Sequence, residues 1–109
     1  MKPSMLGRDP EKVFRSQIKT AVRSLERSIQ DLLDNFWEEP LRRHAHELSN
    51  TLLEGCKTYG FLELASVIRA ITSLVALPME EVLTLETALK EKLKELVSLL
   101  KEMAELIAA

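Results

Sequence analysis

Two histidines two positions apart, His44 and His46, are the side chains of this sequence best suited to chemistry. Residues two apart on a helix point in clearly different directions, so the pair cannot hold one metal ion together. No cluster of His, Cys, Asp and Glu in the sequence completes a metal site either. His46 is either an ordinary exposed or half-buried helix histidine or a reactive one. Arg42 and Arg43 lie three and four residues before it on the same helix face. An imidazole placed there can accept a phosphoryl group, and the two guanidinium groups can balance its charge.

Little else in the sequence supports catalysis. The single cysteine, Cys56, falls on an apolar stripe, so we expect a buried structural thiol rather than a reactive one. The sequence has no glycine-rich phosphate loop and no nucleophile-elbow serine. We therefore expect no cofactor and no conventional enzyme.

The elements that must position these residues are helices. Apolar residues three and four apart predict four amphipathic segments, which run from Asp9 to about Phe36, from about Pro40 to Tyr59, from about Phe61 to Ala76, and from about Pro78 toward Ala109. The Asp9-Pro10-Glu11 step suits a helix start, and Gly60 suits a helix C-terminal cap. Short connections between four such helices predict an all-α fold, an antiparallel up-down four-helix bundle. The first and fourth helices are the longest, so we expect them to project beyond the others.

The same spacing predicts which side chains face inward. The expected core contains Leu48, Leu52, Leu64, Ile68, Leu89 and Leu96. The expected seam of the fourth helix is close to a heptad repeat, which would also allow self-association; it contains Val82, Leu85, Leu89, Leu93, Leu96, Leu100, Met103 and Ile107. We expect Trp37 to pack at one end of the bundle, with a docking surface as the alternative.

Composition narrows the class of protein further. With 46 % hydrophobic residues, 29 % charged residues and only 3 Gly, the chain is typical of one globular domain, over residues 9–109, behind a short disordered lead of residues 1–8. A formal net charge of −2 argues against a nucleic-acid surface. No apolar run approaches the roughly 18–20 residues that span a bilayer. One cysteine fits a reducing compartment, so we expect a cytoplasmic protein without membrane insertion.

The segment from Asn50 to Phe61 resembles the centre of a histidine phosphotransfer (HPt) domain, above all the kind that opens chemotaxis histidine kinases. In that family a phospho-accepting His lies mid-helix, a hydrophobic-Lys-Gly pattern follows it, and about ten residues after the His comes a Gly, often within an aromatic-Gly-Phe step. Here Tyr59-Gly60-Phe61 supplies that step. The resemblance implies an HPt-like bundle in a two-component or chemotaxis-type phosphorelay. Its implied partners are a response-regulator receiver domain, a histidine kinase domain, or both.

Two alignments with that family compete. Counting back ten residues from Gly60 reaches Asn50, and Leu53-Glu54 then replaces the usual Lys-Gly. Asparagine forms no stable phosphoramidate, so this alignment implies a degenerate HPt domain that docks its partner without carrying phosphate. We favour this alignment. It predicts an exposed binding face with Arg42, Arg43, Asn50 and Leu53, in which Leu53 is an apolar anchor for the partner or else packs against the first helix.

In the second alignment His46 is the phospho-acceptor. Ala45-His46-Glu47-Leu48 then matches the start of the family motif, with Arg42 and Arg43 as counter-charges. One extra helical turn separates His46 from Gly60, which rotates the face by only about 40°. This alignment implies an active histidine phosphocarrier. A third interpretation is a helical adaptor or assembly module that has no part in phosphorelays.

Overall fold

The computed structural model describes residues 10–35 and 37–108, and within them the chain forms four helices. They are α1 (Pro10–Asp34), α2 (Glu39–Thr58), α3 (Leu62–Val75) and α4 (Met79–Ala108). These bounds agree with the predicted segments to within a few residues. The predicted helix start at Asp9, the lead of residues 1–8 and Phe36, the predicted end of the first helix, lie outside the described residues.

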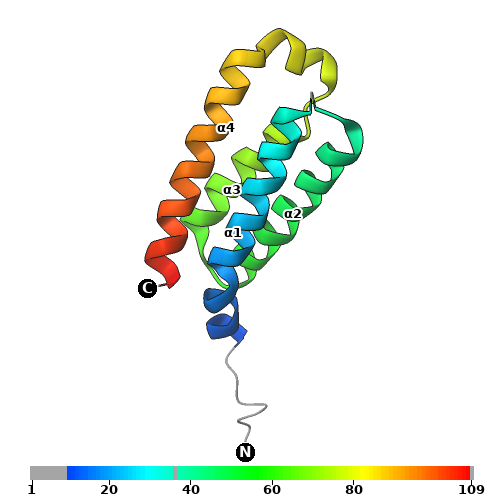
Figure 1. The fold of residues 1–109 in the computed structure, drawn as a ribbon. Helices are drawn as coiled ribbons and strands as arrows, with labels where there is room; N and C mark the ends of the chain where they lie inside the picture. Colours follow the sequence, from blue (N-terminus) through cyan, green and yellow to red (C-terminus); the bar gives the residue numbers. More distant parts are fainter. Residues whose placement is uncertain (1–9, 36, 109) are drawn as a thin grey trace, which may run out of the picture.

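The helices form an antiparallel up-down bundle, as the sequence predicts (Figure 1). Each helix packs against the next one along the chain, and α4 returns to pack against α1. In the described part of the chain, α1 therefore lies diagonally opposite α3, and α2 lies diagonally opposite α4. With 25 and 30 residues, α1 and α4 are longer than α2 and α3, which have 20 and 14. The first turns of α4 rise beyond the ends of its neighbours (Figure 1).

The predicted core is confirmed. Leu52, Leu64, Ile68, Leu89 and Leu96 are buried in one hydrophobic cluster, and Leu48 packs against it in a half-buried position. The stripe of α1 contributes Ile18, Val22, Leu25, Ile29 and Leu32.

A polar contact crosses this core between α2 and α3. Ser49 is fully buried; its hydroxyl donates a hydrogen bond to the His46 carbonyl oxygen at 3.0 Å and accepts one from Thr72 Oγ1 at 3.0 Å. A buried hydroxyl with both partners satisfied costs little and fixes how the two helices face each other.

Leu85 departs from the predicted seam of α4. Its backbone is non-helical (φ −111°, ψ 16°), and its side chain is 49 % exposed. The bend turns Leu85 outward while Val82 before it and Leu89 after it remain buried. Residues 79–88 contain no Pro or Gly, so the sequence has no ordinary kink signal at this point.

Gly60 ends α2 as predicted. Its φ of 77° lies in the left-handed region that glycine adopts without steric cost. The Phe61 N–H donates to the Cys56 carbonyl oxygen at 2.9 Å, and the Gly60 N–H donates to that of Lys57 at 3.4 Å. Those two bonds define a Schellman cap, so the end of α2 is fixed by backbone geometry as well as by sequence.

Candidate functional site

The centre of α2 presents one continuous exposed face, which we name the Asn50 face and define by Arg43, His46, Glu47, Asn50 and Glu54. These residues are three and four positions apart and therefore share one side of the helix. Four of them are exposed and His46 is half-buried. The structure thus brings His46 and Asn50 together on one face, one turn apart.

The cap at Gly60 fixes where this face lies in the helix. The α-helix is unbroken from Glu39 to Thr58, so Asn50 stands ten residues before the left-handed glycine with no bulge between them. His46 stands one full turn further from the cap.

The two arginines predicted to serve a phosphate already have a carboxylate partner. Arg42 is half-buried and forms two hydrogen bonds with Glu39, one from its Nε to Oε2 at 2.9 Å and one from its Nη2 to Oε1. The Arg43 Nε lies 3.9 Å from the same Oε1. The hydrogen bond from Arg42 lowers the pKa of the Glu39 carboxyl. Glu39 was not among the predicted site residues, although its spacing of three and four from the arginines is the usual signal of a helical ion pair.

Carboxylates surround Asn50 itself. Glu47 lies three residues before it and Glu54 four residues after it, and both are exposed. Lys57 Nζ is 3.2 Å from Glu54 Oε2, so that lysine is engaged in its own ion pair. A phosphoryl group on this face would meet two negative side chains, which disfavours its charge.

Leu53 does not belong to the exposed face, and its prediction as an exposed anchor is wrong. Its side chain is only 8 % exposed and is part of the hydrophobic core. Leu53 lies about 60° around the helix from Asn50 and one turn after the buried Ser49. The side of α2 that contains Ser49 faces α3, as the bond to Thr72 shows, so α3 covers Leu53.

Cys56 is buried as expected, with no exposed surface. Burial raises the pKa of its thiol to about 11. The thiolate is the reactive form of cysteine, so this side chain acts as a packing residue near neutral pH.

A groove runs between α1 and α2 beside the Asn50 face, and we name it the α1–α2 groove. It consists of two adjoining hollows that share Ser24, His44 and Leu48. The lower hollow lies nearer the start of α1. Besides the three shared residues it is lined by Phe14, Gln17, Ile18, Ala21, Glu47, Thr51, Leu52 and Gly55. The upper hollow adds Thr20, Arg23, Arg27, Ser28 and Asp31.

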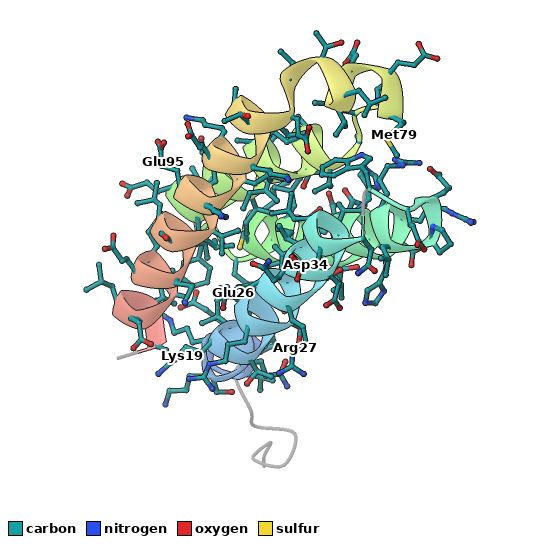
Figure 2. The ribbon with its side chains drawn as sticks, turned by 45° about the horizontal axis from the view of Figure 1, so that its top comes forward. Lys19, Glu26, Arg27, Asp34, Met79 and Glu95 are labelled. Carbon is teal, nitrogen blue, oxygen red and sulfur yellow. The ribbon has the colours of Figure 1, made fainter. Side chains whose placement is uncertain are left out.

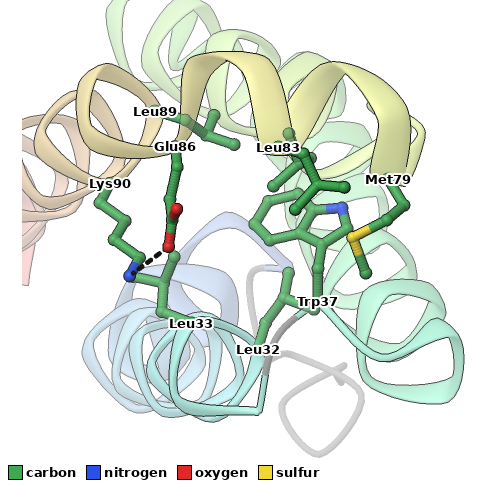
Figure 3. Close-up of a pocket in the computed structure, with 9 residues that line it drawn as sticks. Leu32, Leu33, Trp37, Met79, Leu83, Glu86, Leu89 and Lys90 are labelled. Atoms are coloured by element: carbon green, nitrogen blue, oxygen red, sulfur yellow. Dashed lines mark hydrogen bonds and ion pairs between the residues drawn. The ribbon is translucent and has the colours of Figure 1, made fainter.

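A separate hollow of about 280 Å³ lies at the end of the bundle, between α1, Trp37 and the first turns of α4 (Figure 3). Its walls are apolar, and the indole of Trp37 lies beside Leu83 and Met79. At its rim Lys90 Nζ is 3.3 Å from Glu86 Oε1. This hollow lies beside the bend at Leu85 and does not include the Asn50 face.

Within residues 10–35 and 37–108, no three His, Cys, Asp or Glu side chains come close enough to hold a metal ion. None of the four helices described is long and apolar enough to cross a membrane. The chain matches no protein-family model, no curated protein and no solved structure. The residues and their geometry are therefore the basis for assigning a function.

Proposed function

We propose that this chain is a degenerate HPt module, which docks a receiver domain or a histidine kinase domain of a two-component or chemotaxis-type pathway without carrying phosphate. The observation that carries the proposal is the place of Asn50. It is exposed at the middle of α2, ten residues before a glycine with positive φ, where the family that this segment resembles has its phospho-histidine.

The chemistry of the face supports docking without phosphate. An asparagine amide forms no stable phosphoramidate. Glu47 and Glu54 oppose a phosphoryl charge on either side of it, and Arg42 and Arg43 are engaged by Glu39. A phosphate at His46 would have to displace that carboxylate from both arginines.

Docking to a receiver domain requires few features of an HPt-like bundle. The resemblance places the catalytic aspartate and the metal ion in the receiver, so the bundle needs only a rigid exposed helix. The packed core and the fixed end of α2 supply that rigidity.

The test combines binding with phosphorylation. Receiver and kinase domains encoded in the same genome are titrated against the purified chain by calorimetry. We expect at least one to bind, and Asn50→Arg to weaken that binding at least tenfold because it places a bulky cation at the centre of the face. Thr87→Arg, at an exposed position of α4, makes the same change of charge and is the matched surface control; it should bind as the parent does.

A phosphorylation assay distinguishes the degenerate HPt domain from an active phosphocarrier that uses His46. Incubation with each kinase and ATP should give no acid-labile, base-stable label. A label that His46→Gln removes would establish the active phosphocarrier and overturn the degenerate one. Absence of binding to every receiver and kinase domain would leave the helical adaptor.

A further inference from the structure

We propose that the α1–α2 groove is a second docking surface, which takes an amphipathic helix of a partner protein whose acidic side chains lie at the Arg27 end. This goes beyond the docking proposed for the Asn50 face. It rests on the shape of the groove, the apolar floor of its lower hollow and two arginines that form no ion pair with any of the residues described.

The floor of the lower hollow is apolar. Phe14, Ile18 and Ala21 of α1 meet Leu48 and Leu52 of α2 there. From Phe14 to Asp31 the groove follows α1 for 17 residue steps, about 25 Å at 1.5 Å per residue. A partner helix of about 16 residues matches that length, with apolar anchors spaced three and four apart.

The basic residues of α1 differ in whether they have partners. Arg15 pairs with Glu11 at 3.2 Å, and Lys19 pairs with Glu105 of α4 at 3.2 Å. Arg23 and Arg27 have no ion-pair partner within the part of the chain that the structure describes. Figure 2 shows Lys19 and Glu26 on the side of α1 that faces α4, and Arg27 turned away from α4.

The polar side chains around these arginines complete a site for carboxylates. Arg23 and Arg27 line the upper hollow with His44 of α2, and three hydroxyl residues, Thr20, Ser24 and Ser28, line it too. Guanidinium groups bind carboxylates in a fork geometry, and hydroxyls can donate to the remaining oxygen lone pairs.

Two carboxylates of the groove determine where the acidic side chains of the partner helix can lie. Asp31 closes the upper hollow one turn beyond Arg27, and Glu47 lines the lower hollow. An acidic group is therefore favoured only between them, beside Arg23 and Arg27, and elsewhere along the groove the partner helix must not be acidic. That pattern selects a helix with its acidic residues clustered at one end rather than spread along it.

The experiment uses two fluorescent 16-residue helical peptides with the same leucine stripe. In one, glutamates are clustered in the first two turns; in the other, in the last two turns. A lysine version of each serves as the charge-reversed probe, and binding to the full chain is followed by fluorescence anisotropy. We expect one glutamate peptide to bind and its lysine version to bind at least tenfold more weakly.

Matched variants locate the site. The pair Arg23→Glu and Arg27→Glu should weaken the glutamate peptide at least tenfold, and far-UV circular dichroism should be unchanged because both residues are exposed. The control pair is Arg69→Glu and Lys94→Glu, on α3 and α4, which makes the same change of charge at two exposed positions. That control should bind within twofold of the parent.

Three results would overturn the inference: no binding by either glutamate peptide at millimolar concentration, equal binding by the lysine versions, or equal losses in the two variant pairs. The Asn50→Arg variant should keep its affinity for the peptide. Receiver binding at the Asn50 face and peptide binding in the groove can therefore fail separately.

Discussion

The indole Nε1 of Trp37 donates a hydrogen bond to the carbonyl oxygen of Leu77 at 3.1 Å. This bond ties the α1–α2 connection to the α3–α4 connection at one end of the bundle. Trp37 is 4 % exposed and has a φ of 62°, in the left-handed region that bulky residues rarely adopt. Such a conformation costs about 1–3 kcal/mol and persists only where surrounding contacts hold it.

The first prediction concerns that bond. Trp37→Phe keeps an aromatic ring but leaves the Leu77 carbonyl without its donor, so it should lower the free energy of unfolding by about 1–3 kcal/mol. Trp37→Ala should cost about 3–5 kcal/mol. Urea unfolding followed by circular dichroism measures both, since Trp37 is the only tryptophan of the chain. Equal stability of Trp37→Phe and the parent would show that the bond contributes nothing.

The second prediction concerns Leu53, which is buried against the α3 side of α2. Leu53→Ala should lower the free energy of unfolding by about 2–5 kcal/mol, as for other buried leucines. Leu53→Glu should be more damaging still, because it places an unpaired carboxylate in the core. Thr51→Ala, two residues away and exposed, is the control and should change stability by less than about 0.5 kcal/mol. A Leu53→Glu variant as stable as the parent would contradict the buried position of Leu53.

The third prediction compares two glycines that act for different reasons. A Cβ on Gly55 would lie 2.5 Å from Cε1 of Phe14, so Gly55→Ala forces that ring to move. Overpacking of this kind costs about 1–3 kcal/mol, which outweighs the roughly 1 kcal/mol that alanine contributes to helix propensity. The added truncation Phe14→Leu should recover part of the loss, as thermal unfolding of the single and double variants would show.

At Gly60 space is not the limit, because no atom lies within 4 Å of the position that a Cβ would take. Its φ of 77° is the limit, so Gly60→Ala should cost about 1–2 kcal/mol through backbone strain. Phe14→Leu should not relieve that loss, which distinguishes the two glycines in the same unfolding experiment.

The fourth prediction follows from the Cys56 thiol, whose pKa burial raises to about 11. The folded state holds this proton more tightly than the unfolded chain, whose thiol has a pKa of about 8.5. The resulting stabilisation is complete below about pH 8.5 and is lost as the pH rises toward about 11. Cys56→Ala should abolish this part of the pH dependence. A thiol reagent at about pH 8 should modify the native chain far more slowly than the urea-unfolded chain.

The fifth prediction tests whether Glu54 opposes phosphorylation of a histidine at position 50. Asn50→His supplies an imidazole but leaves Glu54 one turn away, so it should accept little phosphate from a partner that binds the Asn50 face. Adding Glu54→Gly removes that carboxylate and should raise the acid-labile label. Equal labelling of the single and double variants would show that Glu54 does not oppose the phosphate.

Much of the fold follows from patterns that act locally. The spacing of Val22, Leu25 and Ile29 marks a helix face, and Gly60 marks a helix end; both are confirmed because neither depends on a distant residue. Leu53 and Leu85 could not be placed in this way. Whether an apolar residue at the edge of a stripe is covered depends on how near the next helix lies, and helix phase alone does not fix that distance.

The sequence predicts which residues share the Asn50 face, but it does not predict which ion pairs the nearby arginines form. Counting from Gly60 locates Asn50, and the helix period groups it with His46. The spacing of Glu39 from Arg42 and Arg43 allows both ion pairs, but the same arginines are also three and four residues from His46, so spacing alone does not show which group they contact. That Arg23 and Arg27 lack an ion-pair partner within the described residues depends on where α2 and α4 lie, which helix phase does not give.

The even number of helices has a consequence for the connectivity of the bundle. Because α4 returns alongside α1, the first turn of α1 and the last turn of α4 lie at the same end of the bundle, and the α1–α2 and α3–α4 connections lie at the other end (Figure 1). Ion pairs Lys19–Glu105 and Lys101–Glu26 already join these two helices. Each helix therefore packs against two others, but α1 and α4 are joined by no connecting segment. A circular permutant that links α4 to α1 and breaks one of the other three connections should keep all four helix–helix interfaces.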